Sequence, residues 1–568
     1  MKLKFNRTIL LSFFLAFSST SLFSQERGLD QRINEAFTPI ANWWEGLVLH
    51  NFPGTEIPTI IFLLALSSTS LFSQERGLDQ RINDAFTPVA NWWEGLVLHN
   101  FPGTEIPTII FLLVGGALFF TIYFGFVNVR RFSMAINTVR GKYDEIDDHG
   151  AEGEEGEVSH FQALATAVSG TVGNGNIAGV ALAIAVGGPG ATFWMILCGL
   201  LGMSTKFVEC TLGVKYRDIG EDGTVYGGPM YYLTKGLKEK GFARLGKVLA
   251  GIFAFLCVGA SFGGGNAAQS NQAAMQLVES FGMTGGSART IIGLIMMVVV
   301  GVIIIGGIKR IASVTEKVVP LMALMYILAC LYIIISNITF VDDAFGMIFS
   351  QAFNPQAGLG GLLGVLITGF RRAAFSNEAG AGSASIAHSA VKTKYPASEG
   401  LVALLEPFID TVVICTMTAL VIIIFNGDNT VFNYGGEGGV VMINGVASEG
   451  AGITAAAFAK YISFSGPFLT IAVVLFAIST MISWSYYGLQ SWMYIFGKSK
   501  VSEIVYKLMF LVFIVIGAAG DMSSVWAFSD AMILALVFPN MIGLLILFPR
   551  VKEELENFLG AITEIRKT

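Results

Sequence analysis

The sequence is poor in charged residues. Asp, Glu, Lys and Arg make up 13% of its 568 residues, against about 25% in soluble domains. So few charges cannot cover the surface of a soluble protein of this size, and the low charge also excludes a disordered chain. Apolar residues reach 53%, and the mean hydropathy is +0.65. The composition therefore indicates a membrane protein.

Cysteine and histidine are also scarce, with five residues of each. All five cysteines fall within apolar runs, their number is odd and no CxxC pair occurs, so neither a disulfide framework nor a thiolate metal site is expected. The sequence has no HExxH, and no GxSxG with a matching base, which counts against a membrane-embedded enzyme. A net charge of −6 without a basic arm gives no reason to expect nucleic acid as a partner.

Part of the chain occurs twice. Ser18–Leu64 recurs as Ser67–Leu113 at an offset of 49 residues, with only two differences. Solenoid repeats need at least three diverged units, so we interpret the first copy as a passenger without a partner surface of its own. Residues 1–25 have the charged start and short apolar run of an export signal. The block Leu78–Leu98 reads as a short amphipathic helix at the membrane interface.

Long apolar runs follow the second copy. Runs of about 20 apolar residues are typical of membrane helices, and after residue 105 they predict about eleven spans, at 106–128, 160–186, 190–213, 248–280, 288–308, 318–338, 360–390, 401–425, 466–494, 505–524 and 527–549. Lys and Arg gather in alternate loops, and the opposite loops after the first span hold only Arg289 and Lys460. Because cytoplasmic loops carry the positive charge, we predict an outside N-terminus after signal cleavage and a cytoplasmic C-terminus, in the plasma (inner) membrane.

The second and seventh runs are interrupted by small and polar residues. Four glycines lie between Gly170 and Gly179, with two asparagines among them, and glycine permits a helix to unwind at low steric cost. The seventh run, LITGFRRAAFSNEAGAGSASIAHSA, places at membrane depth the polar residues Arg371, Arg372, Asn377 and Glu378. Each charge there costs about 2.5–3.5 kcal/mol on insertion scales. Close packing of small residues is the alternative explanation for either run alone.

The positions of the two interruptions favour a transporter. Spans 2–6 and 7–11 form two sets of five with opposite orientation, each beginning with an interrupted span. Inverted repeats with broken helices and a midplane site are typical of secondary transporters. Free N–H groups at half-helix starts suit an anionic group, and free carbonyls at half-helix ends suit a cation. A zwitterionic amino acid with Na⁺ fits such a site.

Several motifs together resemble the alanine or glycine:cation symporter family. They are TVGNGNIAGVALAIAVGGPGATFWM, GMSTKFVEC, YGGPMYYL, FRRAAFSNEAGAGSA and FIDTVVICTMTAL, in order between about residues 106 and 550. The resemblance implies an all-α LeuT-type fold of two inverted five-helix units with one extra N-terminal helix. It implies import of a small neutral amino acid with Na⁺, or with H⁺ in some members, without a cofactor or an obligatory protein partner.

The domain boundaries follow from these observations. We predict a signal-like segment (1–25), a duplicated segment (18–66, repeated in 67–115), an extracytoplasmic amphipathic segment (67–105), a transporter domain (106–550) and a cytoplasmic tail (551–568). An amino-acid sensor on the same fold is disfavoured, because it would need an appended signalling domain and only 18 residues follow Arg550.

The resemblance also implies site residues. For the substrate they are Thr171, Gly173, Gly175, Asn176, Gln269, Phe370, Ala373, Ala374, Thr480 and Trp484. For the cation, fold analogy points to carbonyls of Ser169 and Val172 facing the hydroxyls of Ser479, Thr480 and Ser483. Hard oxygen ligands without a dedicated carboxylate suit Na⁺.

Bland alternatives remain open for several of these residues. Ser479 and Ser483 can bond the preceding helical turn, and Gln269 can simply join two helices. Glu378 and Asp410 either couple protons or pair with Arg371 or Arg372. Lys206 and Glu209 are expected to pair at the cytoplasmic end of their span, and His388 stands alone.

Overall fold

The computed structural model describes residues 92–101, 106–147, 156–283, 288–354, 361–427, 430–520 and 522–565. The signal-like segment 1–25 and the first copy 18–66 lie outside the described residues, as does most of 67–105. The chain divides into two compact units, Met1–Trp92 and Trp93–Thr568, and the architecture given below is that of the second unit.

The first part of this unit contains the helices that correspond to the predicted spans up to residue 338. In chain order its helices are α5 (Thr108–Tyr123), α6 (Val127–Arg130), α7 (Phe132–Val139), α8 (Asp144–Asp147), α9 (His160–Thr171), η3 (Asn174–Asn176), α10 (Ala178–Gly187), α11 (Gly190–Lys215), α12 (Pro229–Glu239), α13 (Ala243–Phe262), η4 (Gly263–Ala267), α14 (Ala268–Ser280), α15 (Ala288–Ile304), α16 (Gly307–Ser336), η5 (Ile338–Phe340) and α17 (Val341–Ala352).

The second part begins with the other interrupted span. Its helices are α18 (Gly361–Asn377), α19 (Ala384–His388), α20 (Pro396–Ala403), α21 (Leu405–Pro407), η6 (Phe408–Cys415), α22 (Thr416–Asn426), η7 (Glu437–Gly439), α23 (Ala451–Tyr461), α24 (Ser465–Phe496), α25 (Lys500–Ala519), α26 (Met522–Ala535) and α27 (Val537–Ile565).

Strands are confined to two short antiparallel hairpins among the described residues. Asp218–Ile219 (β1) pairs with Val225–Tyr226 (β2), with Asp218 opposite Tyr226. Val441–Ile443 (β3) pairs with Val446–Ser448 (β4), with Val441 opposite Ser448. Both hairpins lie in loops between helices, so the unit is helical, as predicted.

The described helices include enough apolar length for many membrane crossings. Seven are long and apolar enough to span, or eight if the bent pair His160–Thr171 and Asn174–Gly187 counts as one span. Of the other predicted spans, 106–128 and 288–308 contain the shorter apolar helices α5 and α15, and 360–390 contains α18 and α19. A multi-pass membrane protein is therefore confirmed, and the count of eleven spans stays a prediction.

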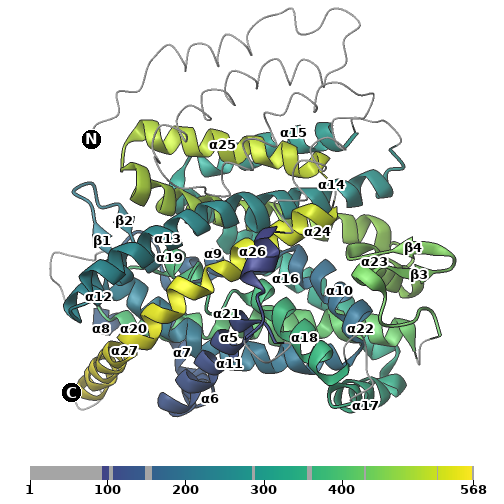
Figure 1. The fold of residues 1–568 in the computed structure, drawn as a ribbon, viewed down its shortest axis with the longest axis horizontal. Helices are drawn as coiled ribbons and strands as arrows, with labels where there is room; N and C mark the ends of the chain where they lie inside the picture. Colours follow the sequence, from purple (N-terminus) through teal and green to yellow (C-terminus); the bar gives the residue numbers. More distant parts are fainter. Residues whose placement is uncertain are drawn as a thin grey trace, which may run out of the picture. The chain divides into compact units, whose positions relative to one another are not determined.

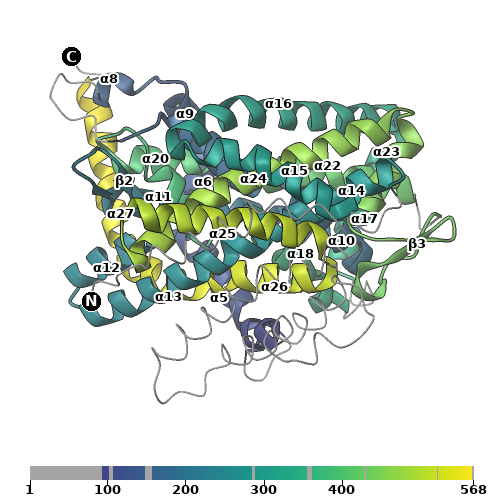
Figure 2. The ribbon, with the colours of Figure 1, turned by 90° about the horizontal axis from the view of Figure 1, so that it is seen from above.

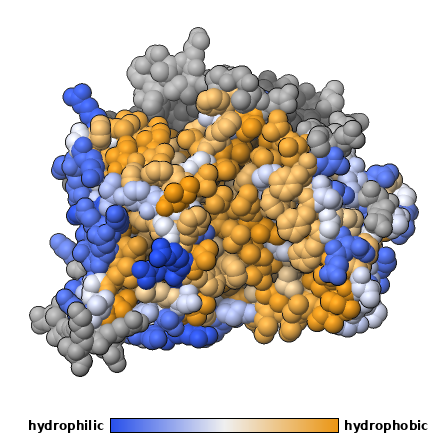
Figure 3. Space-filling view, turned by 90° about the horizontal axis from the view of Figure 1, so that it is seen from below, coloured by the Kyte–Doolittle hydropathy of each residue, from blue (hydrophilic) through white to orange (hydrophobic). Residues whose placement is uncertain are grey.

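Large apolar side chains also face outward. Figure 3 shows a face on which hydrophobic side chains gather, with hydrophilic ones toward its margins. Elsewhere on the surface, α15 and α16 expose Ile295, Val298, Leu324, Leu328 and Ile335, each by more than half. Soluble monomers rarely expose apolar patches above a few hundred Å². Lipid is the solvent that such a surface fits.

Both predicted helix breaks are present. α9 ends at Thr171, and the chain passes through Val172 and Gly173 into η3 and α10 with a bend of 57°. α18 ends at Asn377 and α19 begins at Ala384. Between them Glu378, Gly380 and Gly382 have φ values of 54°, 94° and 83°. Residues other than glycine rarely adopt these backbone angles.

Two further helices change their winding without breaking. η4 joins α13 to α14 and η6 joins α21 to α22, and both are short π-helices. Such turns widen a helix locally and are frequent at functional sites. α24 packs against α9, α13, α14 and α16 and so lies among the other helices (Figures 1 and 2). The core therefore places α24 beside the first broken helix.

Candidate functional site

The two helix breaks lie next to each other. A Cβ atom added at Gly175 would lie 3.5 Å from the Phe375 ring and 3.9 Å from the Cα atom of Ser376. Asn176 donates through Nδ2 to one carboxylate oxygen of Asp410 at 2.7 Å, and Ser376 donates to the other at 2.8 Å. Asp410, on η6, therefore ties the first break to the last turn of α18.

The two arginines of α18 pair elsewhere. Arg372 bonds Asp530 of α26 at 2.6 Å, and Arg371 lies 3.3 Å from the same carboxylate and also pairs with Glu94. The expectation that Glu378 or Asp410 is their structural partner is therefore wrong. Both arginines pair with a carboxylate that the sequence did not single out, because it comes from a helix more than 150 positions along the chain.

Glu378 has its own partners at the second break. Its Oε1 atom accepts from the indole N–H of Trp484 at 3.0 Å, and Ser383 donates to its other oxygen. Trp484 is fully buried, and a Cβ atom added at Gly265 would lie 2.2 Å from its ring. Trp484 thus packs against η4 and is held by the unwound part of the second broken span.

The first break leaves carbonyl oxygens without their usual helical partners. In a continuous helix the N–H of Gly173 would bond the carbonyl of Ser169, but here it donates to Oδ1 of Asn176 at 2.9 Å. Val172 has extended angles, with φ −74° and ψ 94°. The end of α9 therefore presents backbone oxygens to the break. Thr171 does not add a free hydroxyl, because it bonds the carbonyls of the preceding turn.

Gln269 lies directly at this break. Its Oε1 atom accepts from the N–H of Asn174 at 3.1 Å, and its Nε2 atom donates to the carbonyl of Gly264 at 3.1 Å. The side chain therefore joins η3 to η4. Gln269 therefore connects two helices, and its role in substrate binding stays a prediction. The side chain lies beside Gly173, where a Cβ atom would lie 3.1 Å from Oε1.

α24 places two hydroxyl groups beside the first broken span. A Cβ atom added at Gly173 would lie 2.5 Å from Oγ1 of Thr480, and one at Gly170 would lie 3.0 Å from the hydroxyl of Tyr487. Thr480, Ser483 and Tyr487 share one helix face, are buried, and have no hydrogen-bond partner for their hydroxyl oxygens within the described part of the chain. Tyr487 was missed in the sequence, although its spacing from Thr480 and Ser483 is a usable signal.

Ser479 differs from its neighbours. Its hydroxyl donates to the carbonyl of Phe476 at 2.9 Å, which confirms the back-bonding alternative for this residue. Its own carbonyl accepts from the hydroxyl of Ser169 at 2.7 Å. Of the predicted cation residues, Ser169 and Ser479 are thus in direct contact, and Ser479 joins α9 to α24 through its backbone.

The three residues expected to line a side-chain pocket are buried on α18, but the structure places them differently from one another. Phe370 packs against Trp194 of α11, with ring centroids 5.8 Å apart. Ala373 and Ala374 are buried on the following turn. Phe375 is the aromatic side chain beside Gly175, and it also lies 5.3 Å from the ring of Trp526. Phe375 was not predicted as a site residue from the sequence.

The chemistry of the site is that of oxygen ligands. Among the described residues no group of three or more His, Cys, Asp or Glu side chains could hold a metal ion. The oxygens gathered at the first break are hydroxyls and backbone carbonyls, which bind hard cations rather than soft metals. A helical membrane protein with such a polar site between two unwound helices has the architecture of a secondary transporter.

The chain belongs to the sodium:alanine symporter family. The profile of that family matches residues 96–567. The sodium/alanine symporter AgcS of Methanococcus maripaludis is 40% identical over 457 residues, which cover 80% of this chain and 94% of that protein. The probable sodium/glutamine symporter GlnT of Bacillus subtilis is 34% identical over 436 residues, 77% of this chain and 84% of its own. The protein is thus an amino-acid transporter of this family and not an enzyme.

Solved structures offer a more distant comparison. MhsT in complex with L-phenylalanine aligns with a TM-score of 0.45 and 16% identity, over 70% of this chain and 99% of its own.

Proposed function

We propose that the protein imports a small neutral amino acid, alanine or glycine, together with Na⁺ by alternating access. Membership of a sodium/amino-acid symporter family supports the reaction class. The two adjacent helix breaks support a binding site at the membrane midplane. The proposed architecture has eleven spans, which form a 5+5 inverted repeat and one extra N-terminal helix. The predicted orientation, with a cytoplasmic C-terminus, makes the end of α9 that bears His160 the cytoplasmic end.

In this proposal the amino acid binds between η3, Gln269 and α24. The backbone at Gly173 and Gly175 receives the charged ends of the substrate, and Thr480 lies against Gly173. Asn176 shapes the break by holding the N–H of Gly173. In this proposal Trp484, which packs against Gly265 of η4, closes one side of the site. One of the relatives is named as a probable glutamine symporter. We therefore propose that the size of the pocket determines which amino acid each member of the family carries.

The observation that carries the proposal is a pair of buried hydroxyls on α24, the helix that packs against α9. The hydroxyls of Thr480 and Ser483 lack partners among the described residues, although both side chains are at least 98% buried. Leaving a buried polar group unsatisfied costs about 1–3 kcal/mol. A Na⁺ ion ligated by these hydroxyls and by the carbonyls of Ser169 and Val172 would remove that cost.

The decisive measurement is uptake of labelled alanine into proteoliposomes under an imposed Na⁺ gradient. We expect Na⁺ stimulation, inhibition by unlabelled glycine, and a several-fold higher half-saturating Na⁺ concentration in Thr480→Ala and Ser483→Ala. Ser479→Ala is the matched control, because its hydroxyl is already bonded within α24. Uptake without Na⁺ stimulation, or an equal shift in all three variants, would remove the cation assignment.

A further inference from the structure

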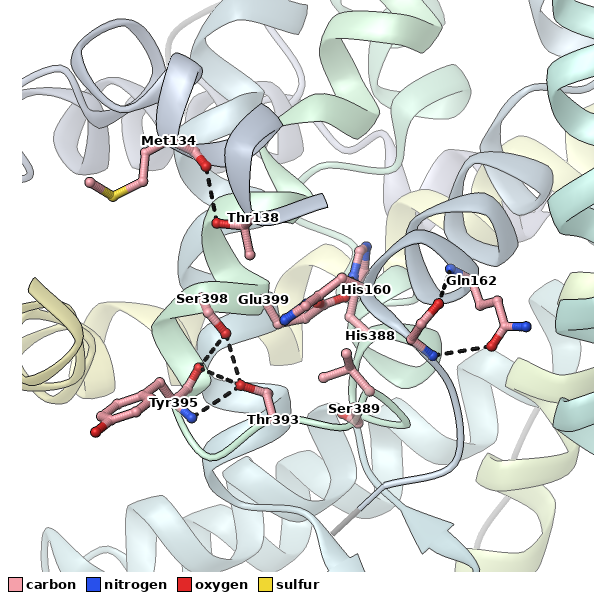
Figure 4. A network of polar contacts seen from close by, with 12 residues as sticks. Met134, Thr138, His160, Gln162, His388, Ser389, Thr393, Tyr395, Ser398 and Glu399 are labelled. Carbon is pink, nitrogen blue, oxygen red and sulfur yellow. Dashed lines mark hydrogen bonds and ion pairs between the residues drawn. The ribbon is translucent and has the colours of Figure 1, made fainter. Parts of the chain in front are cut away.

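A chain of ionisable side chains lies outside the site described above. Figure 4 shows His160 of α9 and His388 of α19 on either side of Glu399 of α20. Each histidine bonds a different oxygen of that carboxylate through its Nδ1 atom. The chain continues from His388 to Glu406 of α21, and from Glu406 to Lys206 of α11 at 3.0 Å. All but His160 are fully buried.

This chain sits where the two broken spans are joined through their backbones. Val158, just before α9, forms a parallel bridge with Val391, just after α19. The N–H of Lys392 donates to the carbonyl of Val158 at 2.8 Å, and the N–H of Glu157 donates to that of Ala390 at 2.8 Å. The two histidines therefore flank a contact that joins the start of the first broken span to the end of the second.

One pair in the chain is incomplete. Nε2 of His388 and Oε2 of Glu406 face each other at 3.6 Å, and within the described residues neither atom has a hydrogen-bond partner. Because an ionised Glu399 only accepts, Nδ1 of His388 carries a hydrogen. In the neutral ring Nε2 then carries a lone pair that faces the carboxylate of Glu406. In the charged ring Nε2 carries a hydrogen and can donate to that carboxylate. The arrangement lacks one proton to become a closed hydrogen-bonded chain.

We propose that His388 and Glu406 form a proton-binding site that locks the cytoplasmic ends of α9 and α19. A proton taken from water onto Nε2 of His388 draws α19 toward α21 and, through Glu399, holds His160 and α9. Loss of that proton sets a lone pair against Glu406 and loosens the same contact. The direction of opening rests on the proposed function, in which this end faces the cytoplasm.

The groups around His388 set the charge balance. Lys206 balances Glu406, so the remaining negative charge is that of Glu399, which the two histidines share. Beyond these, Glu209 and Cys210 on α11, Tyr487 on α24 and Glu378 at the second break interact electrostatically with the Lys206–Glu406 pair. Glu157 lies in the segment before α9. Burial raises its pKa, against the effect of a bond from the N–H of Val225.

Hydrogen–deuterium exchange of the full-length protein in detergent tests the proposal. We expect the amides of α9 to lose protection at least about tenfold between pH 6 and 9, after correction for chemical exchange, with the slope of a single proton. His388→Gln keeps a donor toward Glu406 at every pH, so its α9 amides are expected to stay protected and to show no titration. Glu157→Gln is the matched control, and it should retain the pH dependence.

A flat profile in the wild-type protein would overturn the proposal, as would a titration that survives in His388→Gln or disappears in Glu157→Gln. Na⁺-driven alanine uptake by the same preparations at pH 6 separates this question from the transport function. Uptake with a flat profile removes the proton site alone. A titrating profile without uptake removes the proposed substrate or coupling ion and leaves the proton site standing.

Discussion

Gly173 is the residue on which the site geometry depends most directly. Its φ of −141° is open to any residue, so backbone strain does not explain the glycine. Space does, because a Cβ atom there would lie 2.5 Å from Oγ1 of Thr480 and 3.1 Å from Oε1 of Gln269. The missing side chain lets η3, α14 and α24 meet at one point.

We expect Gly173→Ala to reduce alanine uptake at least about tenfold, which corresponds to about 1.4 kcal/mol, because the new methyl group displaces Thr480 or Gln269. Gly179→Ala is the matched control in the same broken span. Gly179 is also buried, but a Cβ atom there would meet nothing within 4 Å. Uptake per folded protein in proteoliposomes checks both variants, and equal losses in the two would contradict the steric argument.

For single residues, the sequence predicted which segments form the site more accurately than it predicted which side chains contact each other. The glycine-rich stretch and the hydroxyls of α24 were predicted to meet, and the structure brings Gly173, Gln269 and Thr480 together. The partner of Asn176 was not predicted, because Asp410 reaches it from a π-helical turn that no periodicity reveals. Phe375 rather than Phe370 lies beside Gly175, since five positions along a helix turn a side chain to a different face.

The elements are connected by buried charges as well as by apolar packing. The sequence paired Lys206 with Glu209, three positions along the same helix, at the cytoplasmic end of the span. This expectation is wrong. Lys206 is fully buried and bonds Glu406 of α21, whereas Glu209 accepts from Asn540 of α27 at 2.7 Å. A charge that cannot reach water needs a partner of opposite sign, and here another element supplies it.

We expect Lys206→Met to destabilise the protein by about 3–5 kcal/mol, because it leaves Glu406 buried without its counter-charge. Adding Glu406→Gln should recover much of that loss. Lys215→Met provides the control on the same helix, since Lys215 pairs with Glu554 at 2.8 Å but is 31% exposed, and such surface pairs contribute about 0–1 kcal/mol. Thermal unfolding in detergent measures all three, and a similar loss for Lys206 and Lys215 would refute the argument.

The helix breaks were predictable as elements, and the π-helices were not. Glycine and asparagine at close spacing weaken a helix wherever they occur, so both interruptions could be read from composition. η6 consists of apolar residues around Asp410 and Thr411, and its sequence is indistinguishable from an ordinary membrane helix. Its winding depends on the neighbours that bond Asp410, which are distant in the chain.

On the scale of the whole molecule, hydropathy predicted a helical multi-pass protein and placed each run on a helix or helix pair. It could not fix the number of crossings, because α5 and α15 are 16 and 17 residues long, shorter than the roughly 20 that a span requires. The inverted repeat depends on the number and direction of the membrane crossings, so it also stays a proposal. The family profile adds a firmer boundary, since it begins at residue 96, within the second copy of the repeat.

That boundary leads to a prediction about the duplication. Deleting Ser18–Leu66 removes the first copy and keeps the second, which continues into α5 and carries Glu94, the partner of Arg371. We expect this variant to insert into the membrane and to take up alanine at the wild-type rate. Deleting 18–115 removes Glu94 and the first half of α5 as well, and we expect uptake to be lost. Uptake normalised to membrane-inserted protein measures both, and loss of activity in the shorter deletion would give the first copy a role that the repeat alone does not explain.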